Sequence, residues 1–125
     1  TILRLIYKVK GVEKTALITD ALACAASDSK TAFDPRVIIE DGVCKLKDHS
    51  SLAGSIATMD KVVKVAADAG IPFEDVIRMA TETPAKVMNC FDRVGSLEEG
   101  KDADIVLMNK DLEITGVWSQ GKKYV

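Results

Sequence analysis

The chain has 125 residues, the usual size of one domain, and its 47% hydrophobic content suits a globular fold and excludes disorder. A formal net charge of −2 provides no basic surface, so nucleic acid and membranes are not expected partners. The apolar runs are too short to span a bilayer and no secretory signal is recognisable, which favours a cytoplasmic protein. Three widely spaced cysteines without a CxxC pair predict reduced thiols rather than a disulfide framework or a zinc knuckle.

The first elements expected are a helix and a buried strand. Apolar residues recur at helical spacing over residues 2–9, and Gly11 stands where a helix would end. The apolar run 16–18 follows after a short loop and predicts a strand buried on both faces. A helix, a short loop and such a strand are typical of an α/β protein with a parallel sheet.

A long loop and a hairpin are expected next. Residues 21–35 are mostly small and polar and predict a loop, and loops of this length are usually functional. Asp41-Gly42, between the apolar segments 37–40 and 43–46, predicts two strands joined by a two-residue type I′ turn. A second loop is expected over residues 47–55.

Two amphipathic helices are predicted after this loop. Thr58 is a suitable N-cap for the first, and Gly70 and Pro72 end it. The second helix begins at residue 73. Its buried side is expected to consist of Phe73, Val76, Ile77 and Ala80.

The pattern changes from helix to strand in the last third of the chain. Thr83 and Pro84 are expected at the N-cap and first position of a short helix that continues to Met88. Three strands are then predicted, over residues 104–108, 112–118 and 122–125. These strands are expected to form a β-meander within the tail, residues 93–125. Residues 1–92 are expected to form the α/β part. Trp118 is expected in the core together with Phe73.

Asp20 is the strongest candidate for a catalytic residue. It follows an apolar run and precedes small residues, and in (β/α) barrels the chemistry lies where strands end and loops begin. Local signals alone favour a different interpretation, since an aspartate after a strand often caps a turn or a helix.

Several segments together resemble a known family. Residues 95–107 with Thr83-Pro84-Ala85-Lys86 resemble the C-terminal signature of the amidohydrolase superfamily. A more specific match is an ordered set of short motifs that resembles the C-terminal third of the N-acetylglucosamine-6-phosphate deacetylases. These motifs are Thr19-Asp20-Ala21, Asp41-Gly42-Val43, Leu52-Ala53-Gly54-Ser55 and Thr58-Met59, and the resemblance extends over essentially the whole chain.

The resemblance implies a fold, a reaction and a set of site residues. It implies the C-terminal part of a metal-dependent (β/α)₈ barrel, with its last strand and helices in residues 1–92, and strands of a small β-sandwich in residues 93–125. The reaction implied is hydrolysis of the acetamide of N-acetylglucosamine 6-phosphate to glucosamine 6-phosphate and acetate. Asp20 matches the catalytic aspartate, and Leu52, Ala53 and Gly54 match a loop that contacts the substrate, an amino sugar phosphate, through its sugar; the phosphate is left unassigned.

The resemblance also implies a divalent metal, zinc or iron, in the intact enzyme. A bound metal lowers the pKa of water towards about 7, and a carboxylate can then act first as a general base and later as a general acid. The family's ligands, a glutamate and two histidines on earlier strands, have no counterpart here, so no residue of this chain is assigned to the metal and the chain alone is expected to be inactive. His49 lies in a polar stretch with no second ligand nearby, and a surface turn is expected there because a zinc site needs three or four ligands.

Two alternatives remain open on the sequence. The superfamily tail would equally fit another amidohydrolase, such as a dihydroorotase-like enzyme. The chain could instead be a non-catalytic module that associates with itself, because a single barrel strand exposes two unpaired edges. Whichever interpretation holds, the chain is expected to form a homo-oligomer.

Overall fold

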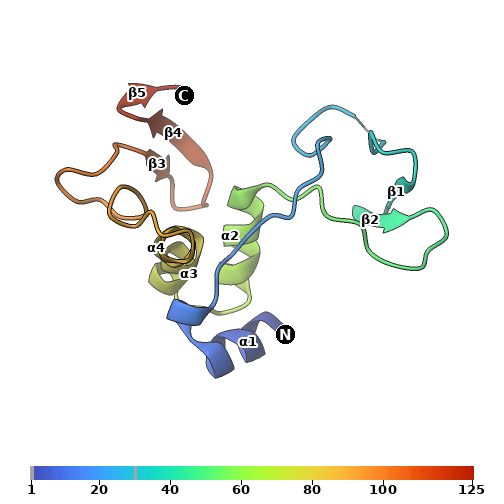
Figure 1. The fold of residues 1–125 in the computed structure, drawn as a ribbon, viewed down its shortest axis with the longest axis horizontal. Coiled ribbons are helices and arrows are strands. Elements are labelled where there is room, and N and C mark those ends of the chain that lie inside the picture. Colours follow the sequence, from blue (N-terminus) through green and yellow to red (C-terminus); the bar gives the residue numbers. More distant parts are fainter. Residues whose placement is uncertain (1, 30) are drawn as a thin grey trace. The chain divides into compact units, whose positions relative to one another are not determined.

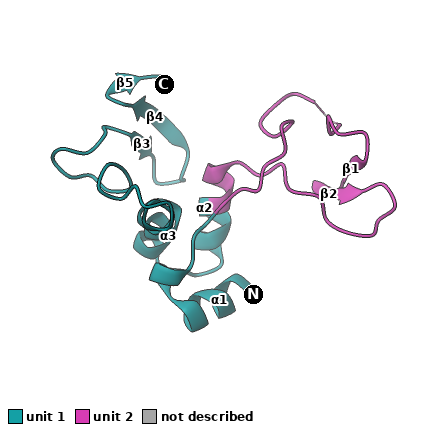
Figure 2. Ribbon diagram, viewed as in Figure 1, with its two compact units in different colours: residues 1–17, 63–125 teal, residues 18–62 magenta. Residues whose placement is uncertain are grey.

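The computed structural model describes residues 2–29 and 31–125, which divide between two compact units (Figures 1 and 2). Unit 1 comprises Thr1–Leu17 and Val63–Val125, and unit 2 comprises Ile18–Val62. The boundary falls within helix α2, Met59–Asp68. Helices and strands both occur, so a mixed α/β composition is confirmed, although both sheets of the described residues are antiparallel. These units do not coincide with the expected division after residue 92, which remains a prediction. Within the described residues no helix has the length and apolar character needed to cross a membrane.

The N-terminal helix α1, Ile2–Lys10, forms as predicted. Gly11 has a φ of 75° and its N–H donates to the carbonyl of Tyr7 at 2.9 Å, which ends the helix before the short 3₁₀ turn η1, Val12–Lys14. The Tyr7 hydroxyl donates to the carboxylate of Asp75, and this hydrogen bond raises the pKa of Tyr7. The apolar residues of α1 remain exposed to solvent, since Ile2 and Val9 are both at least 70% exposed.

The strand expected over residues 16–18 is wrong. Leu17 is buried and its N–H donates to the carbonyl of Met79 at 2.8 Å, but Ile18 is 69% exposed. A strand needs a ladder of hydrogen bonds to a neighbour, and in residues 2–29 and 31–125 the segment 16–18 pairs with no other strand; the nearest bridge, Ala21 to Ser55, lies beyond it. Residues 16–18 therefore do not lie within a sheet, and Leu17 is held by one backbone hydrogen bond to Met79.

Helices α2 and α3, Phe73–Ala80, form at the predicted places. The N–H of Val62 donates to the carbonyl of Thr58 at 3.0 Å, which confirms Thr58 at the N-cap position. The buried face of α3 is rotated from the expected one, because Met79 is fully buried whereas Phe73 is 45% exposed. The core of unit 1 contains Leu17, Val63, Ala66, Ile71, Val76, Met79 and Ala85.

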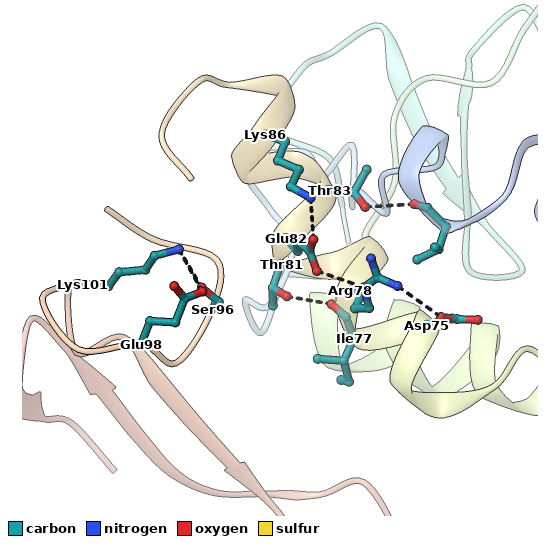
Figure 3. Close-up of polar contacts among 11 residues, drawn as sticks. Asp75, Ile77, Arg78, Thr81, Glu82, Thr83, Lys86, Ser96, Glu98 and Lys101 are labelled. Carbon is teal, nitrogen blue, oxygen red and sulfur yellow. Dashed lines mark hydrogen bonds and ion pairs between the residues drawn. The ribbon is translucent and has the colours of Figure 1, made fainter. Parts of the chain in front are cut away.

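Helix α4, Glu82–Val87, begins before the predicted N-cap. Thr81 occupies the N-cap position, so Thr83 lies in the first turn, where it is buried and donates its hydroxyl to the carbonyl of Val12 at 2.9 Å (Figure 3). Pro84 is tolerated in this turn because the first amides of a helix have no intrahelical acceptor. The predicted capping role of Thr83 is wrong; this side chain instead joins α4 to η1.

A network of charged side chains connects α3 to α4 (Figure 3). Arg78 Nε donates to Glu82 at 2.9 Å, and Lys86 donates to the other oxygen of the same carboxylate. These two hydrogen bonds, that of Arg78 first, lower the pKa of Glu82 to about 2. Further along the chain, Lys101 lies 3.6 Å from the ring centre of Phe91. The network stabilises unit 1 beside its apolar core.

The C-terminal strands form the predicted meander. They are β3, Ile105–Met108, β4, Ile114–Ser119, and β5, Lys122–Lys123, paired antiparallel in the order β3-β4-β5. Gly116 is buried, and a Cβ there would lie 2.6 Å from the Trp118 ring. Trp118 is only half-buried, so its predicted place in the core is confirmed in part.

Unit 2 is built around one hairpin. Strands β1, Val37–Glu40, and β2, Val43–Leu46, pair antiparallel. Asp41 has a φ of 51° and Gly42 a φ of 74°, and positive φ at both turn residues is the type I′ geometry that was predicted. Cys24 and Cys44 are buried free thiols, in agreement with the prediction from cysteine spacing.

Candidate functional site

The structure brings together the two sequence segments that were predicted to form the site. The N–H of Ser55 donates to the carbonyl of Asp20 at 2.8 Å, and the carbonyl of Ser55 accepts from the N–H of Leu22 at 2.8 Å. The Ser55 hydroxyl also donates to the carbonyl of Thr19, 36 positions earlier in the chain. Asp20 and the 52–55 loop are thus adjacent within unit 2.

The hairpin supports the other side of this loop. An isolated antiparallel bridge pairs Leu52 with Lys45 of β2. The N–H of Ala53 donates to the carbonyl of Cys44 at 3.0 Å, and the N–H of Leu46 donates to the carbonyl of Ser51 at 3.0 Å. The loop is therefore held between β2 and residues 19–22.

Gly54 is required by the close approach of these segments. Its φ is 70°, in the left-handed region that favours glycine. A Cβ at this position would lie 3.0 Å from Leu22 Cδ2 and 3.1 Å from the carbonyl oxygen of Asp20. Any larger residue would push the loop away from the candidate catalytic residue.

Asp20 has the accessibility that proton transfer requires. The residue is exposed, and among residues 2–29 and 31–125 its carboxylate has no hydrogen-bond or ion-pair partner. Its φ of 48° is unusual for a non-glycine residue and is held by the backbone contacts to Ser55. A free carboxylate on a fixed backbone can accept a proton from one group and deliver it to another.

The substrate-binding prediction concerns Leu52, Ala53 and Gly54. Leu52 is 72% exposed, so its side chain is available to a ligand, whereas Ala53 and Gly54 are partly covered. In the part of the chain that the structure describes, the N–H of Gly54 donates no hydrogen bond and could be offered to an acceptor. The geometry is compatible with the predicted contact, which remains a prediction.

No group of three or more potential metal ligands occurs among the described residues. His49 is exposed, with its Nδ1 3.8 Å from a Glu40 carboxylate oxygen, as expected for a surface turn. Burial raises the pKa of the Cys44 thiol, which keeps it protonated and makes it a poor ligand. The residues described here do not by themselves hold a metal.

A hollow of about 290 Å³ in unit 2 is lined by residues other than those of the predicted site. Its walls are Thr31, Ala32, Asp34, Pro35, Val37, Ile38, Ile39 and Lys47. Because neither Asp20 nor the 52–55 loop contributes to it, this hollow is not the proposed reaction centre.

Ser55 is the residue whose part in the site was not predicted. It was recognised only as the last residue of the motif Leu52-Ala53-Gly54-Ser55, without a role of its own. Its hydroxyl also accepts from the N–H of Ala57 at 3.1 Å, so one side chain connects the backbone at Thr19 with the backbone at residues 55–57. A serine directly after a glycine is too common for the sequence to single it out.

The family model described as "Amidohydrolase family" matches residues 11–124, and the chain belongs to this family. An N-acetylgalactosamine-6-phosphate deacetylase of Shewanella sp. (strain ANA-3) is 32% identical over 118 residues, which are 93% of this chain and 30% of that protein. An N-acetylglucosamine-6-phosphate deacetylase of Haemophilus influenzae is 28% identical over 123 residues, 95% of this chain and 32% of that protein.

Solved structures give the same result. The N-acetylglucosamine-6-phosphate deacetylase from Pasteurella multocida aligns with a TM-score of 0.90 and 33% identity, over 98% of this chain and 33% of its own. A mutant of the Mycobacterium smegmatis enzyme in complex with N-acetyl-D-glucosamine-6-phosphate aligns with a TM-score of 0.84 and 31% identity, over 98% of this chain and 33% of that chain. The chain spans about a third of the length of these proteins.

Proposed function

We propose that this chain forms the C-terminal part of a metal-dependent deacetylase that converts N-acetylglucosamine 6-phosphate to glucosamine 6-phosphate and acetate. The observation that carries the proposal is the hydrogen-bonded junction of Asp20 with the 52–55 loop, in a chain that aligns over 98% of its length with a solved deacetylase. The resemblance assigns catalysis to the first of these segments and substrate contact to the second.

In this proposal Asp20 performs both proton transfers. Its carboxylate takes a proton from the attacking water while the new carbon–oxygen bond forms at the acetamide carbonyl. The protonated carboxyl then gives that proton to the amine nitrogen as the carbon–nitrogen bond breaks. Leu52, Ala53 and Gly54 hold the amino sugar beside it.

The cofactor proposed for the complete enzyme is a divalent metal, zinc or iron. A complete ligand set must include residues beyond those that the structure describes, since no group of three or more potential ligands occurs among them. In the corresponding architecture, residues 1–92 would complete a (β/α)₈ barrel and residues 93–125 would contribute strands to a small β-sandwich. The exposed apolar face of α1 and the unpaired segment 16–18 support this assignment, because within the described residues neither has the partners that a closed barrel would supply.

A chimeric enzyme tests the proposal. The part of the Pasteurella multocida deacetylase that aligns with this chain would be replaced by residues 1–125, and acetate release would be measured with zinc or iron(II). We expect turnover by the chimera and none by the 125-residue chain alone. Asp20→Asn should reduce kcat by about 10²–10⁴-fold, the usual contribution of general acid–base catalysis.

Matched controls distinguish a catalytic role of Asp20 from the general effect of removing a negative charge. Asp28→Asn removes another exposed carboxylate of unit 2 and should leave kcat unchanged. The galacto epimer should be assayed in parallel because the Shewanella relative is named for it, and dihydroorotate tests the alternative amidohydrolase activity. Full activity in the Asp20→Asn chimera, or hydrolysis of dihydroorotate alone, would contradict the proposed function.

A further inference from the structure

We propose that Ser55 is a positioning residue whose hydroxyl fixes the backbone that carries the Asp20 carboxylate. This inference rests on the proposed function, in which Asp20 moves the protons. It assigns to Ser55 no contact with substrate, only the task of holding Asp20 in one orientation.

The contacts of Ser55 converge on the residues beside Asp20. Its hydroxyl donates to the carbonyl of Thr19, directly before Asp20, and its N–H donates to the carbonyl of Asp20 itself at 2.8 Å. Its carbonyl accepts from Leu22, two positions further on. Each peptide unit on either side of the Asp20 Cα is thereby bound to the same serine.

This double attachment matters because Asp20 has a left-handed backbone. A φ of 48° is unusual for a residue with a Cβ, and the contacts to Ser55 hold Asp20 in this conformation. The side chain leaves the Cα in a direction set by φ and ψ, so release of the Thr19 carbonyl would allow the carboxylate to move. No other side chain within the described residues donates to the carbonyl of Thr19.

Ser55 is itself held on two sides, which makes it a suitable anchor. Its hydroxyl accepts from the N–H of Ala57 at 3.1 Å, so the oxygen acts as donor and acceptor at once. The preceding Gly54 lets the loop approach the Asp20 carbonyl more closely than any other residue would. The loop is further joined to β2 through Ala53, which transmits the rigidity of the hairpin to Asp20.

Nuclear magnetic resonance of the full 125-residue chain tests the inference without relying on catalysis. In Ser55→Ala, the Asp20 amide and Cα resonances should shift or broaden as its backbone samples other conformations. Amide exchange at Ser55 and Leu22 should rise by about fivefold, the effect of losing one hydrogen bond. Ser55→Thr keeps the hydroxyl and should restore both properties. Ser50→Ala removes a serine hydroxyl that donates to Asp48 and should leave Asp20 unaffected.

Kinetics in the chimeric enzyme supply a second readout. Ser55→Ala should lower kcat by about 10–100-fold, the effect of a displaced catalytic group, with KM changed less than kcat. Ser55→Thr should recover most of the loss. If the chimera is inactive, the proposed function fails while the resonance experiment still decides whether Ser55 fixes Asp20.

Three results would overturn the inference. The first is an Asp20 spectrum in Ser55→Ala that matches that of Ser50→Ala. The second is a Ser55→Thr variant as perturbed as Ser55→Ala. The third result applies if Ser55→Ala does not fold. Ser55→Cys then replaces it, because cysteine keeps the size of the side chain but is a weaker donor. A wild-type Asp20 spectrum and wild-type exchange rates in Ser55→Cys would overturn the inference.

Discussion

Substitution of Met79 by alanine is the most direct test of the core of unit 1. Met79 is fully buried in α3, at 0% exposure, and its carbonyl accepts the N–H of Leu17. The change removes Cγ, Sδ and Cε and leaves a cavity lined by apolar side chains. Burial of this kind predicts a loss of about 2–5 kcal/mol in the free energy of unfolding. Met79→Leu nearly conserves volume and should cost less than about 1.5 kcal/mol.

The matched control is the same substitution at Met88, which is 73% exposed after α4 and should change stability by no more than about 0.5 kcal/mol. Urea unfolding followed by circular dichroism at 222 nm measures both, because the helical signal comes mainly from unit 1. With a loss of about 2–5 kcal/mol and a urea dependence of about 1–3 kcal/mol per molar, the Met79→Ala midpoint should fall by about 0.7–5 M. Equal midpoints for Met79→Ala and Met88→Ala would refute the assignment of Met79 to the core.

Three further predictions concern unit 1. Gly95→Ala should destabilise unit 1 by more than about 1 kcal/mol, because φ is 95° and the new Cβ would lie 2.7 Å from the Cβ of Ala85. The control is Gly100→Ala, which has a similar φ of 91° but no neighbouring atom within 4 Å, and it should cost less stability in the same urea titration. The pKa of Glu82 is lowered from 4.5 to about 2, so the stability that its ionised form contributes is complete above pH 4.5 and is lost as the pH falls towards 2. In Glu82→Gln the free energy of unfolding should therefore depend less on pH between 4.5 and 2. Identical pH dependence in both proteins would contradict this. The pKa of Tyr7 is raised above 10.0, so the stability that its protonated hydroxyl contributes is complete below pH 10 and is lost as the pH rises through the raised pKa. Tyr7→Phe should therefore lose less stability at alkaline pH than the unchanged protein. An unchanged alkaline transition would count against the hydrogen bond from Tyr7 to Asp75.

The elements that could be predicted are those whose signals are local. The Asp41-Gly42 turn requires positive φ at both residues, which only a few dipeptides provide, so sequence alone specifies the hairpin. Gly11 at the end of α1 and Thr58 at the start of α2 are equally local signals. The meander follows from strand segments separated by short turns.

The errors arose where distant residues decide the outcome. Residues 16–18 have the composition of a buried strand, but a strand exists only with partners, which the described chain does not supply. The N-cap of α4 moved from Thr83 to Thr81 because the Thr83 hydroxyl binds the distant Val12 carbonyl, a contact that no local pattern encodes. Phe73 was expected on the buried face of α3 but is 45% exposed, whereas Met79 is fully buried, because the buried face of a helix depends on what packs against it.

The site was predictable only in part for the same reason. Asp20 and the 52–54 loop emerged from a resemblance, and their adjacency follows from hydrogen bonds that only the structure displays. Ser55 makes those bonds with its backbone and a small side chain. Such contacts depend on the path of the chain, so the sequence could not distinguish Ser55 from the chain's other serines.

The interruption of unit 1 by unit 2 has a consequence for the order of folding. The two parts of unit 1 meet through contacts such as that from Thr83 to Val12, which are 71 positions apart. Closing a flexible loop of that length costs about 4 kcal/mol in chain entropy. The β1–β2 hairpin closes only a two-residue turn, and β-hairpins in general form within about 1–10 μs. We therefore expect the hairpin to form early and shorten the effective loop, so that α1 joins the remaining helices late.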